Sequence, residues 1–368
     1  MKGEGLLLLL RAYSPFPLLP PVKRFGCGCA AENMRTRILA FLDTPPGRVA
    51  RYLVSLALVA WFVVSIDWRQ LGGLRGDFAW GLVAWAALLA GAAYPLHAWR
   101  WWLLLRAQGL SLSLAWAHRV TWIGTFYNAF LLGGLGGDAA RAFYVCRDEP
   151  ARRAGGLAAT LLDRVLGLVV LMSLAALALV ARAGALARES GLRWIFVGTL
   201  AISLGGGVAA WLLLRIAPAR WPAVLRRALG EPRLDTLADL WARTRATPRE
   251  HAAALSVSYA IWLLDFVSIW LLARAVGLPL PFLETCIAAA VAYAATALPI
   301  SVGGHGVREG AMLLVLGLFG LVPAAGPDRD RALLLAVLVW AVTMLWSLVG
   351  GGVLLFASPH ISRSRPLL

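Results

Sequence analysis

The sequence predicts an all-α, polytopic membrane protein with about eight apolar spans, and three observations support this class. Residues of the set Ala, Val, Ile, Leu, Met, Phe, Trp, Tyr and Cys make up 60% of the 368 positions and charged residues only 15%, whereas soluble domains carry roughly 25% charged residues. The mean hydropathy is +0.74. The apolar residues come in runs close to the ~20 residues that a helix needs to cross a bilayer.

The first 48 residues form a tail that differs from the rest. Its apolar run, residues 6–10, is too short for a signal-peptide core, and no small-residue cleavage site follows it. Prolines at positions 15, 17, 20 and 21 break any helix. Because Met34 offers an alternative start, we expect residues 1–33 either to be disordered or to reflect an overextended gene start.

Apolar segments separated by short polar loops follow this tail. They comprise residues 52–66, 78–96, 114–132, 157–181, 194–214, 252–273, 283–298, 307–321 and 333–356. A polar linker, 215–251, divides a transmembrane domain of residues 49–357 into halves of about 49–214 and 252–357, and residues 358–368 form a short tail. After the second segment, Arg100-Trp101-Trp102 has the composition of an interfacial aromatic and basic girdle.

The excess of basic residues sits in the loops. Lys and Arg number 35 against 19 Asp and Glu, which gives a net charge of +16. This distribution follows the positive-inside rule rather than the separate basic face of a nucleic-acid-binding protein. Eight Lys or Arg lie at or before position 51, and eight arginines lie in 215–249. We therefore expect a protein of the cell membrane with both termini and the linker in the cytoplasm, and no nucleic-acid partner.

The same count gives the third segment an unusual path. Residues 97–119 and the loop 141–153, which holds four arginines, both belong in the cytoplasm. The segment 114–132 must then enter and return on one side, as a re-entrant hairpin bent at its glycines. The pair 283–298 and 307–321 begins and ends outside, either as two full spans or as a hairpin dipping in from the outer face.

Two glycine-rich breaks match each other. They read Leu135-Gly136-Gly137-Asp138-Ala139-Ala140-Arg141 and Val302-Gly303-Gly304-His305-Gly306-Val307-Arg308. Each has an aliphatic residue, two glycines and, four residues later, an arginine. Such interruptions at corresponding places in two halves are typical of transporter binding sites. Because one hairpin opens inward and the other outward, we expect an inverted internal repeat.

These breaks are suited to bind a phosphate. Glycines let the backbone turn and present free N–H groups, and a helix that starts there directs its positive end at the break. Arg141 and Arg308, one turn later, add a fork-shaped and permanently charged partner. Asp138 either caps the first helix or restrains Arg141. Asn128 either caps that helix or donates to a lipid headgroup.

Three charged residues interrupt the apolar spans. Asp163 and Arg164 are neighbours about 100° apart on a helix, so each is expected to face a different partner. Asp265 lies centrally in segment 252–273. It is either half of an interhelical ion pair, with Arg164 as the candidate partner, or a proton or cation relay. We favour the pair, because buried charges are normally paired.

The remaining candidates for chemistry are few. His305 titrates near neutral pH in ordinary surroundings, although a plain polar contact is its simpler role, and Glu309 directly follows Arg308. Cys27 and Cys29 have no second pair to complete a zinc site. The sequence contains no Walker, dinucleotide, His-Glu-x-x-His or Gly-x-Ser-x-Gly motif. We expect no metal, no cofactor and no enzymatic activity.

Over about residues 49–357 the sequence resembles the lysylphosphatidylglycerol synthase transmembrane-region family of flippase-like membrane proteins. The motifs that carry the resemblance are Asn128 followed by Gly136-Gly137-Asp138 and Arg141, then Leu161-Leu162-Asp163-Arg164, and finally Leu298-Pro299-Ile300-Ser301-Val302-Gly303-Gly304-His305-Gly306-Val307-Arg308-Glu309-Gly310. Leu132 departs from the proline that the family usually has. The resemblance implies lipid handling: members with a soluble aminoacyl-transferase domain are associated with making and flipping lysylphosphatidylglycerol, and some standalone members with lipid-linked sugar pathways. No transferase domain is found in this sequence, so aminoacyl transfer is not implied.

We therefore expect a lipid flippase or transporter for an anionic phospholipid or a polyprenyl-phosphate type of lipid. The expected substrate-binding residues are Asn128, Gly136, Gly137, Asp138, Arg141, Asp163, Arg164, Asp265, Ser301, Gly303, Gly304, His305, Arg308 and Glu309. One alternative is a membrane transferase for a lipid-linked sugar, which would use Asp138 and Glu309 as a carboxylate pair. Another is a non-transporting accessory subunit whose partner is a lipid synthase or glycosyltransferase.

Overall fold

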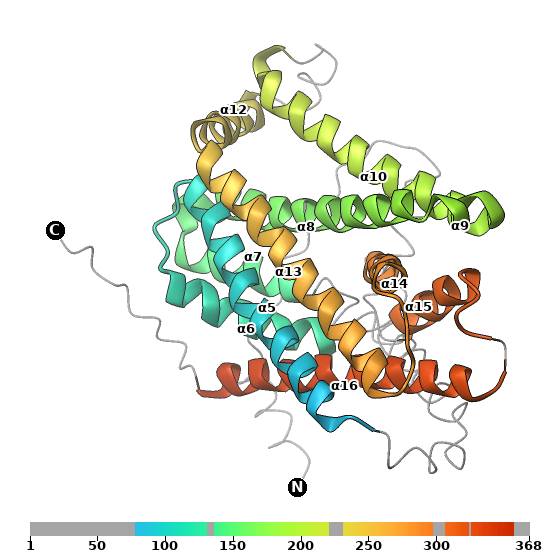
Figure 1. The fold of residues 1–368 in the computed structure, drawn as a ribbon. Coiled ribbons are helices and arrows are strands. Elements are labelled where there is room, and N and C mark those ends of the chain that lie inside the picture. Colours follow the sequence, from blue (N-terminus) through green and yellow to red (C-terminus); the bar gives the residue numbers. More distant parts are fainter. Residues whose placement is uncertain (1–77, 131–135, 221–230, 297–305, 324, 357–368) are drawn as a thin grey trace, which may run out of the picture. The chain divides into compact units, whose positions relative to one another are not determined.

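A computed structural model describes residues 78–130, 136–220, 231–296, 306–323 and 325–356. The chain divides into two units, residues 1–48 and 49–368, and every described residue lies in the second. Eleven α-helices fill most of these ranges (Figure 1): α5 (Trp80–Ala107), α6 (Leu114–Phe130), α7 (Gly136–Asp148), α8 (Arg153–Ala181), α9 (Ala183–Arg188), α10 (Ser190–Arg215), α12 (Glu231–Ala246), α13 (Pro248–Ala275), α14 (Phe282–Ala295), α15 (Val307–Leu318) and α16 (Pro327–Phe356). The expected tail 1–48 and span 52–66 lie outside the described residues.

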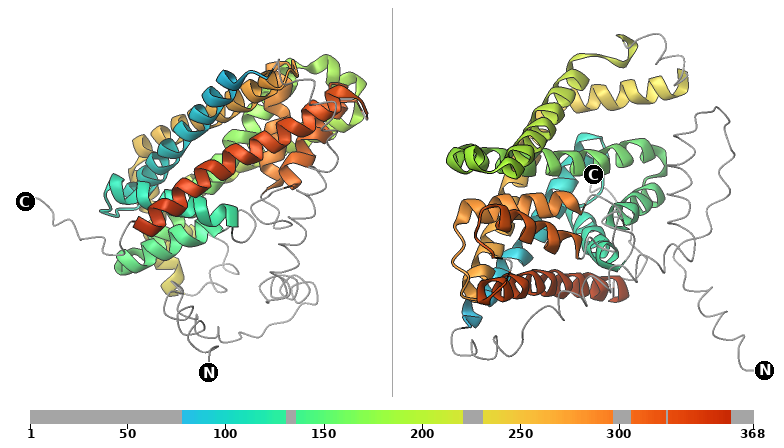
Figure 2. Two further views of the ribbon diagram at one scale, coloured as in Figure 1. Left: turned by 90° about the horizontal axis from the view of Figure 1, so that it is seen from below. Right: turned by 90° about the vertical axis from the view of Figure 1, so that its right-hand side faces the viewer.

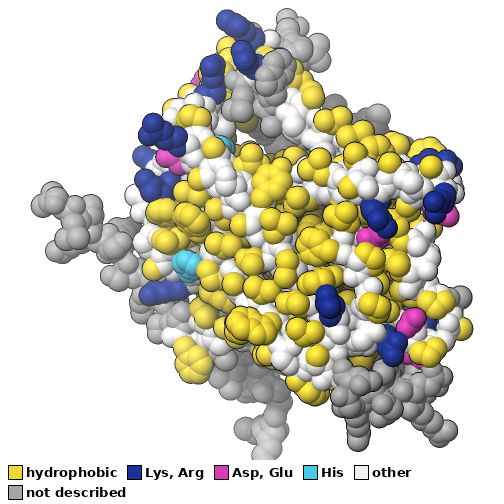
Figure 3. Space-filling model, viewed as in Figure 1, with side chains coloured by type: hydrophobic (Ala, Val, Ile, Leu, Met, Phe, Trp, Pro, Cys, Tyr) yellow, Lys and Arg dark blue, Asp and Glu magenta, His cyan; other side chains and the backbone are white. Residues whose placement is uncertain are grey.

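Five of the described helices are long and apolar enough to cross a membrane, namely α5, α8, α10, α13 and α16. Each covers all or nearly all of a segment that the sequence predicted as a span, so the all-α polytopic class is confirmed. Their apolar side chains remain at the surface: Trp194 on α10 is 76% exposed and Leu204 60%. Hydrophobic side chains cover most of the face in Figure 3, and Lys and Arg gather at its edges, notably over α12 and the start of α13. A surface of this kind suits lipid rather than water.

The antiparallel helices α5 and α13 lie side by side along much of their length (Figures 1 and 2). The N–H of Ala79 donates to the carbonyl of Ala275 at one end (3.2 Å). At the other end, the amide of Gln108 donates to the hydroxyl of Thr244, in the last turn of α12 just before α13 (2.9 Å). Between them, the buried Ser268 hydroxyl of α13 donates to an α5 carbonyl (2.8 Å). We name the two ends of the bundle the Ala79 end and the Gln108 end.

Helices α6 and α7 form a hairpin that opens at the Gln108 end. The indole N–H of Trp116, in the first turn of α6, donates to the carboxylate of Asp148, the last residue of α7 (2.8 Å). The indole N–H of Trp102 on α5 donates to the carbonyl of Leu112, just before α6 (2.9 Å). Both open ends therefore lie beside the C-terminal part of α5, as the re-entrant path requires. The depth of this hairpin in a bilayer stays a prediction.

Helices α14 and α15 form a second hairpin, which opens at the Ala79 end. Glu284, in the first turn of α14, pairs with Arg182, which directly follows α8. Leu318, the last residue of α15, lies against Gly191 at the start of α10. With 14 and 12 residues, these helices are about 21 and 18 Å long, short of the ~30 Å hydrocarbon core. The lengths favour the hairpin over two full spans.

The contacts of the first half recur in the second with the elements exchanged. The hairpin α6–α7 packs with its helix α6 on α16, and the hairpin α14–α15 packs with its helix α14 on α8. The long helices α5 and α13 face each other between them. Gly350 lets α16 approach the α6 backbone at Trp122, and a Cβ at Gly351 would lie 2.9 Å from the Phe126 ring. An inverted repeat predicts this exchange; the symmetry relation itself stays a prediction.

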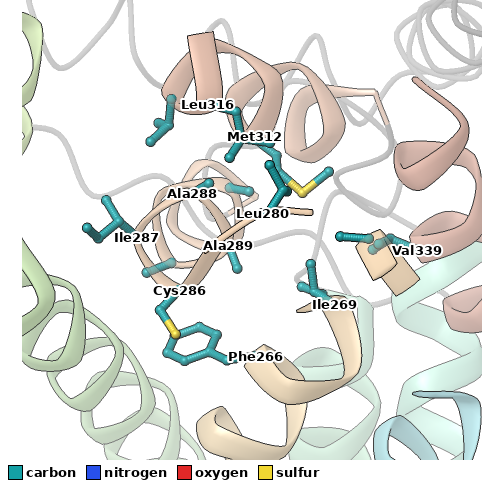
Figure 4. Packing of buried hydrophobic residues seen from close by; sticks show 14 of the residues in the cluster. Phe266, Ile269, Leu280, Cys286, Ile287, Ala288, Ala289, Met312, Leu316 and Val339 are labelled. Atoms are coloured by element: carbon teal, nitrogen blue, oxygen red, sulfur yellow. The ribbon is translucent and has the colours of Figure 1, made fainter. Parts of the chain in front are cut away.

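The largest hydrophobic core surrounds α14, most of whose residues are buried. Ala288 lies on the side of α14 that faces Met312 of α15, Ile287 points out on a different side of the helix, and Phe266 and Ile269 approach from α13 (Figure 4). Alanines at 288, 289, 290 and 292 keep the helix narrow enough for neighbours to pack closely on several sides. This packing fixes the second hairpin against the long helices.

Candidate functional site

A cluster of buried charges is centred on Asp163, in the middle of α8. One carboxylate oxygen accepts a hydrogen bond from Nε of Arg100 on α5 (2.6 Å) and the other from Nη1 of Arg141 on α7 (3.0 Å). The exposed fractions are 3% for Asp163, 4% for Arg100 and 9% for Arg141. Hydrogen-bonded ion pairs of this kind allow charges to be buried among apolar helices. We call these three residues the Asp163 cluster.

Hydroxyl groups from two further helices and an aromatic ring of α5 complete this cluster. Arg100 also donates to the hydroxyl of Ser258 on α13 (3.2 Å), and Arg141 to that of Thr121 on α6 (3.3 Å). The Arg141 guanidinium lies 5.0 Å from the ring centroid of Trp101, a distance at which a cation and an aromatic face attract. With histidine neutral, the cluster holds two positive charges and one negative charge, so it carries an excess of one positive charge.

The second hairpin carries its own buried arginine. Arg308, in the first turn of α15, donates from Nε and Nη2 to one carboxylate oxygen of Glu309 (3.0 and 2.7 Å). The other oxygen of Glu309 accepts from the N–H of Gly306, which precedes α15 with φ +82°. Arg308 also donates to the hydroxyl of Thr343 on α16 (3.2 Å) and lies 5.9 Å from the ring centroid of Tyr293. The carboxylate of Glu309 therefore binds a free backbone N–H at the N-terminus of α15, where a negative charge is favourable.

A small cavity adjoins this second arginine. It is lined by Ile269, Ala289, Ala292, Tyr293, Arg308, Glu309, Met312 and Val339, and has room of about 10 Å³ for a water-sized sphere. One water molecule needs about 10–15 Å³ by this measure. The cavity therefore holds at most about one water and cannot contain a lipid headgroup in this conformation.

Helix α5 connects the two arginine sites. The rings of Tyr94 and His97 lie one turn apart with centroids 6.4 Å from each other. His97 is within electrostatic range of the Asp163 cluster, and Tyr94 is within range of Arg308 and Asp265. Arg141 and Arg308 thus belong to neighbouring sites, and each already has a carboxylate partner.

The partners of the other charged candidates differ from those expected. Asp138 pairs with Arg164 (2.5 Å). Of the two roles considered for Asp138, restraint of Arg141 is therefore wrong, and so is the choice of Arg164 as the partner of Asp265. No hydrogen bond or ion pair joins Asp265 to another of the described residues, although the charge of Arg308 acts on it electrostatically. The expectation that Asp163 and Arg164 face different partners is confirmed.

Asn128 caps the second helix of the first hairpin, one of the two roles expected for it. Its side-chain oxygen accepts from the N–H of Gly137 (2.7 Å), in the first turn of α7. The approach requires glycine on both helices, because a Cβ at Gly137 would lie 2.6 Å from the carbonyl oxygen of Gly124. Gly136 and Gly137 are both buried. In the second break, Ser301, Gly303, Gly304 and His305 lie outside the described residues.

Sequence reasoning missed Arg100 and assigned it to an interfacial girdle. That assignment is wrong, since Arg100 and Trp101 are both buried and α5 continues to Ala107 rather than ending near position 96. One signal could have found it: His97 and Arg100 lie three residues apart, on one face of the same helix. Hydroxyl partners such as Thr121 and Ser258 carry no comparable signal. Nowhere in the described ranges do three or more His, Cys, Asp or Glu gather as a metal site would require.

Comparison with known proteins supplies the family. No curated protein and no solved structure matches the chain. The family described as the lysylphosphatidylglycerol synthase TM region matches residues 48–352, which include both hairpins and both arginine sites. The chain, a multi-pass membrane protein, therefore belongs to the lysylphosphatidylglycerol synthase transmembrane-region family.

Proposed function

We propose that this protein is a lipid transporter of the flippase type, which binds the phosphate of an anionic phospholipid or a phosphate-bearing lipid intermediate. The observation that carries the proposal is the pair of buried arginines, Arg141 and Arg308, one from the second helix of each hairpin. Buried guanidinium groups among membrane helices are costly and are typical of substrate paths. Guanidinium is also the side chain that binds phosphate in a bidentate manner. Membership of a lipid-related family supports the same class of substrate.

The arrangement of the hairpins supports transport rather than binding alone. The first opens at the Gln108 end and the second at the Ala79 end, so the two arginines lie on elements that reach the bilayer interior from opposite sides. Sites between oppositely inserted, broken helices are typical of alternating-access transporters. We place the Gln108 end in the cytoplasm of the cell, because arginines of the loop 141–153 and of the described part of the linker, Arg152 and Arg243, lie beside Gly109 there.

The transferase alternative has less support. It needs two carboxylates at one cleft, whereas Asp138 pairs with Arg164 and Glu309 with Arg308 in the other hairpin. We therefore favour a transporter without enzymatic activity, whose partners are membrane lipids. An accessory subunit would differ in failing to move lipid when reconstituted alone.

Substitution of the two arginines tests the proposal. Arg141→Ala and Arg308→Ala each remove charged hydrogen bonds to the lipid, and one such bond contributes about 1.5–3 kcal/mol. Each variant should therefore bind anionic lipid with a dissociation constant about tenfold higher or more. Arg308→Lys keeps the charge but loses the fork, and should have a smaller effect. The measurement is native mass spectrometry of the purified protein titrated with phosphatidylglycerol.

Arg243→Ala provides the matched control. Arg243 pairs with Asp239 on the exposed surface of α12 (2.8 Å), so its loss removes an ion pair of the same type outside the site. The thermal stability of each variant is measured alongside, because the alanine variants leave buried carboxylates without a partner. Wild-type lipid binding by both alanine variants at normal stability would refute the proposal.

A further inference from the structure

In the described conformation, the groups that would bind a lipid phosphate in the first hairpin already bind oxygens of the protein. Arg141 donates to Asp163, and the N–H of Gly137 at the start of α7 donates to Asn128. A carboxylate accepts from guanidinium with nearly the same geometry as a phosphate. Asp163 therefore occupies the position that an incoming anion would need.

Asp163 is built to release Arg141 without losing its charge partner. Its other oxygen is bound by Arg100 at 2.6 Å, the shorter of its two ion-pair contacts, against 3.0 Å to Arg141. If Arg141 turned to a phosphate, the carboxylate would keep Arg100, and Arg100 would keep its contact with Ser258. An uncompensated buried charge, the costly outcome of breaking an ion pair, is thereby avoided.

The charge of the cluster favours the exchange. Two guanidinium groups and one carboxylate leave an excess of one positive charge among the described residues, buried between five helices. A phosphodiester carries one negative charge and would neutralise the cluster while Asp163 remains ionised. The described residues of the second hairpin carry no such excess, because Arg308 faces Glu309 directly and Asp265 lies within electrostatic range.

We propose that Asp163 is an internal competitor that occupies Arg141 until the phosphodiester of a lipid displaces it, and that Arg100 is the positioning residue that holds Asp163 during the exchange. This inference rests on the proposed function, and it names the residue that sets the affinity of that same site. A purely structural ion pair would lose lipid binding, through loss of the fold, whichever member was changed. The exchange instead predicts opposite effects for its two members.

Two single variants give these opposite effects. Asp163→Asn frees Arg141 and should tighten binding of dioctanoyl phosphatidylglycerol about tenfold or more, the range of one charged hydrogen bond. Arg100→Gln leaves Asp163 wholly committed to Arg141 and removes the positive excess, so it should weaken binding by a similar factor. Binding is measured by titration of the detergent-purified full chain.

The double variant Arg100→Gln with Asp163→Asn keeps the result interpretable if Asp163→Asn alone does not fold. It buries one charge instead of three, which protein interiors usually tolerate better, and it leaves Arg141 without a competitor. Its affinity should exceed that of Arg100→Gln and at least equal that of the wild type. Asp239→Asn is the matched control, because it also removes the carboxylate of an Asp–Arg pair, but on the exposed surface of α12. Hydrogen bonding by Arg243 lowers the pKa of the Asp239 carboxyl, so this carboxyl is ionised at neutral pH. The control should bind lipid as the wild type does.

A competition with inorganic phosphate distinguishes a lipid from a free anion. Displacement of the lipid only by millimolar or higher phosphate supports a lipid headgroup site, whereas phosphate binding as tightly as the lipid would overturn the lipid assignment. Weaker lipid binding in the folded Asp163→Asn protein or in the double variant would overturn the exchange. Arg141→Ala, titrated with the same lipid, separates the two proposals. If the exchange fails but Arg141→Ala weakens lipid binding, Arg141 is still part of the lipid site of the proposed transporter. If Arg141→Ala binds lipid as the wild type does, Arg141 is not part of a lipid site.

Discussion

Replacing Gly137 with alanine tests whether close apposition of α6 and α7 holds the first hairpin together. A Cβ at this position would lie 2.6 Å from the carbonyl oxygen of Gly124 and 2.7 Å from Cγ and Nδ2 of Asn128, where ordinary contact begins at 3.4 Å. The nearest atom belongs to the backbone and cannot rotate away. The two helices must therefore separate, and the hydrogen bond from Gly137 to Asn128 must lengthen or break.

The size of the effect follows from three contributions. Overpacking of a well-packed contact costs about 1–3 kcal/mol, and the lost cap about 0.5–1.5 kcal/mol. The higher helix propensity of alanine returns up to about 1 kcal/mol. These contributions sum to a range of about 0.5–4.5 kcal/mol, and we expect Gly137→Ala to lower the free energy of unfolding by an amount near its middle, about 2–3 kcal/mol.

The assay is equilibrium unfolding in mixed micelles, followed by tryptophan fluorescence. Gly207→Ala on α10 is the matched control, because no atom lies within 4 Å of a Cβ built there; this change should leave stability equal or raise it by up to about 1 kcal/mol. Equal stability of the two alanine variants would refute the close-packed hairpin.

Two further predictions concern Asp265 and the orientation. No ion pair joins Asp265 to another described residue, and the residue is partly buried. Asp265→Asn should therefore keep or raise thermal stability, because it removes the desolvation cost of a partly buried carboxylate, and it should slow lipid transport in proteoliposomes. A clear loss of stability would restore the structural-pair interpretation. The orientation is tested in a protein without other cysteines, by adding a membrane-impermeant maleimide to intact cells. Ala187→Cys, at an exposed position of α9, should react, and Asp235→Cys on α12 should not. The reverse pattern would invert the proposed orientation.

The amino-acid sequence determined the class and the positions of the spans, because hydropathy is a local property. An apolar run of about 20 residues is long enough to span the hydrocarbon core, whichever helices surround it. Helices α8, α10, α13 and α16 lie where such runs predicted them. Arginine counting also predicted that the segment at 114–132 turns back, and the structure brings the start of α6 and the end of α7 together at Asp148. The end of α5 was placed too early, because Arg100 looked like an interfacial residue when read without its partner.

Local geometry also determined part of the site. The ~100° step between neighbouring helix residues was enough to predict that Asp163 and Arg164 have separate partners. The amide of Asn128 lies nine residues before the N–H that it caps, close enough in sequence for a capping role to be expected. A helix starts at the first glycine break, as predicted, since α7 begins at Gly136. The close approach of Gly137 to Gly124 was not predicted.

The identity of the charge partners was decided only by the tertiary structure. Asp163 joins Arg100 and Arg141, which lie 63 and 22 residues away, while Arg164 takes Asp138 and leaves Asp265 without it. Helical periodicity gives the face on which a side chain lies but not which other helix that face meets. That choice depends on how five helices pack at once, where the cost of burying each unpaired charge selects the arrangement in which opposite charges meet.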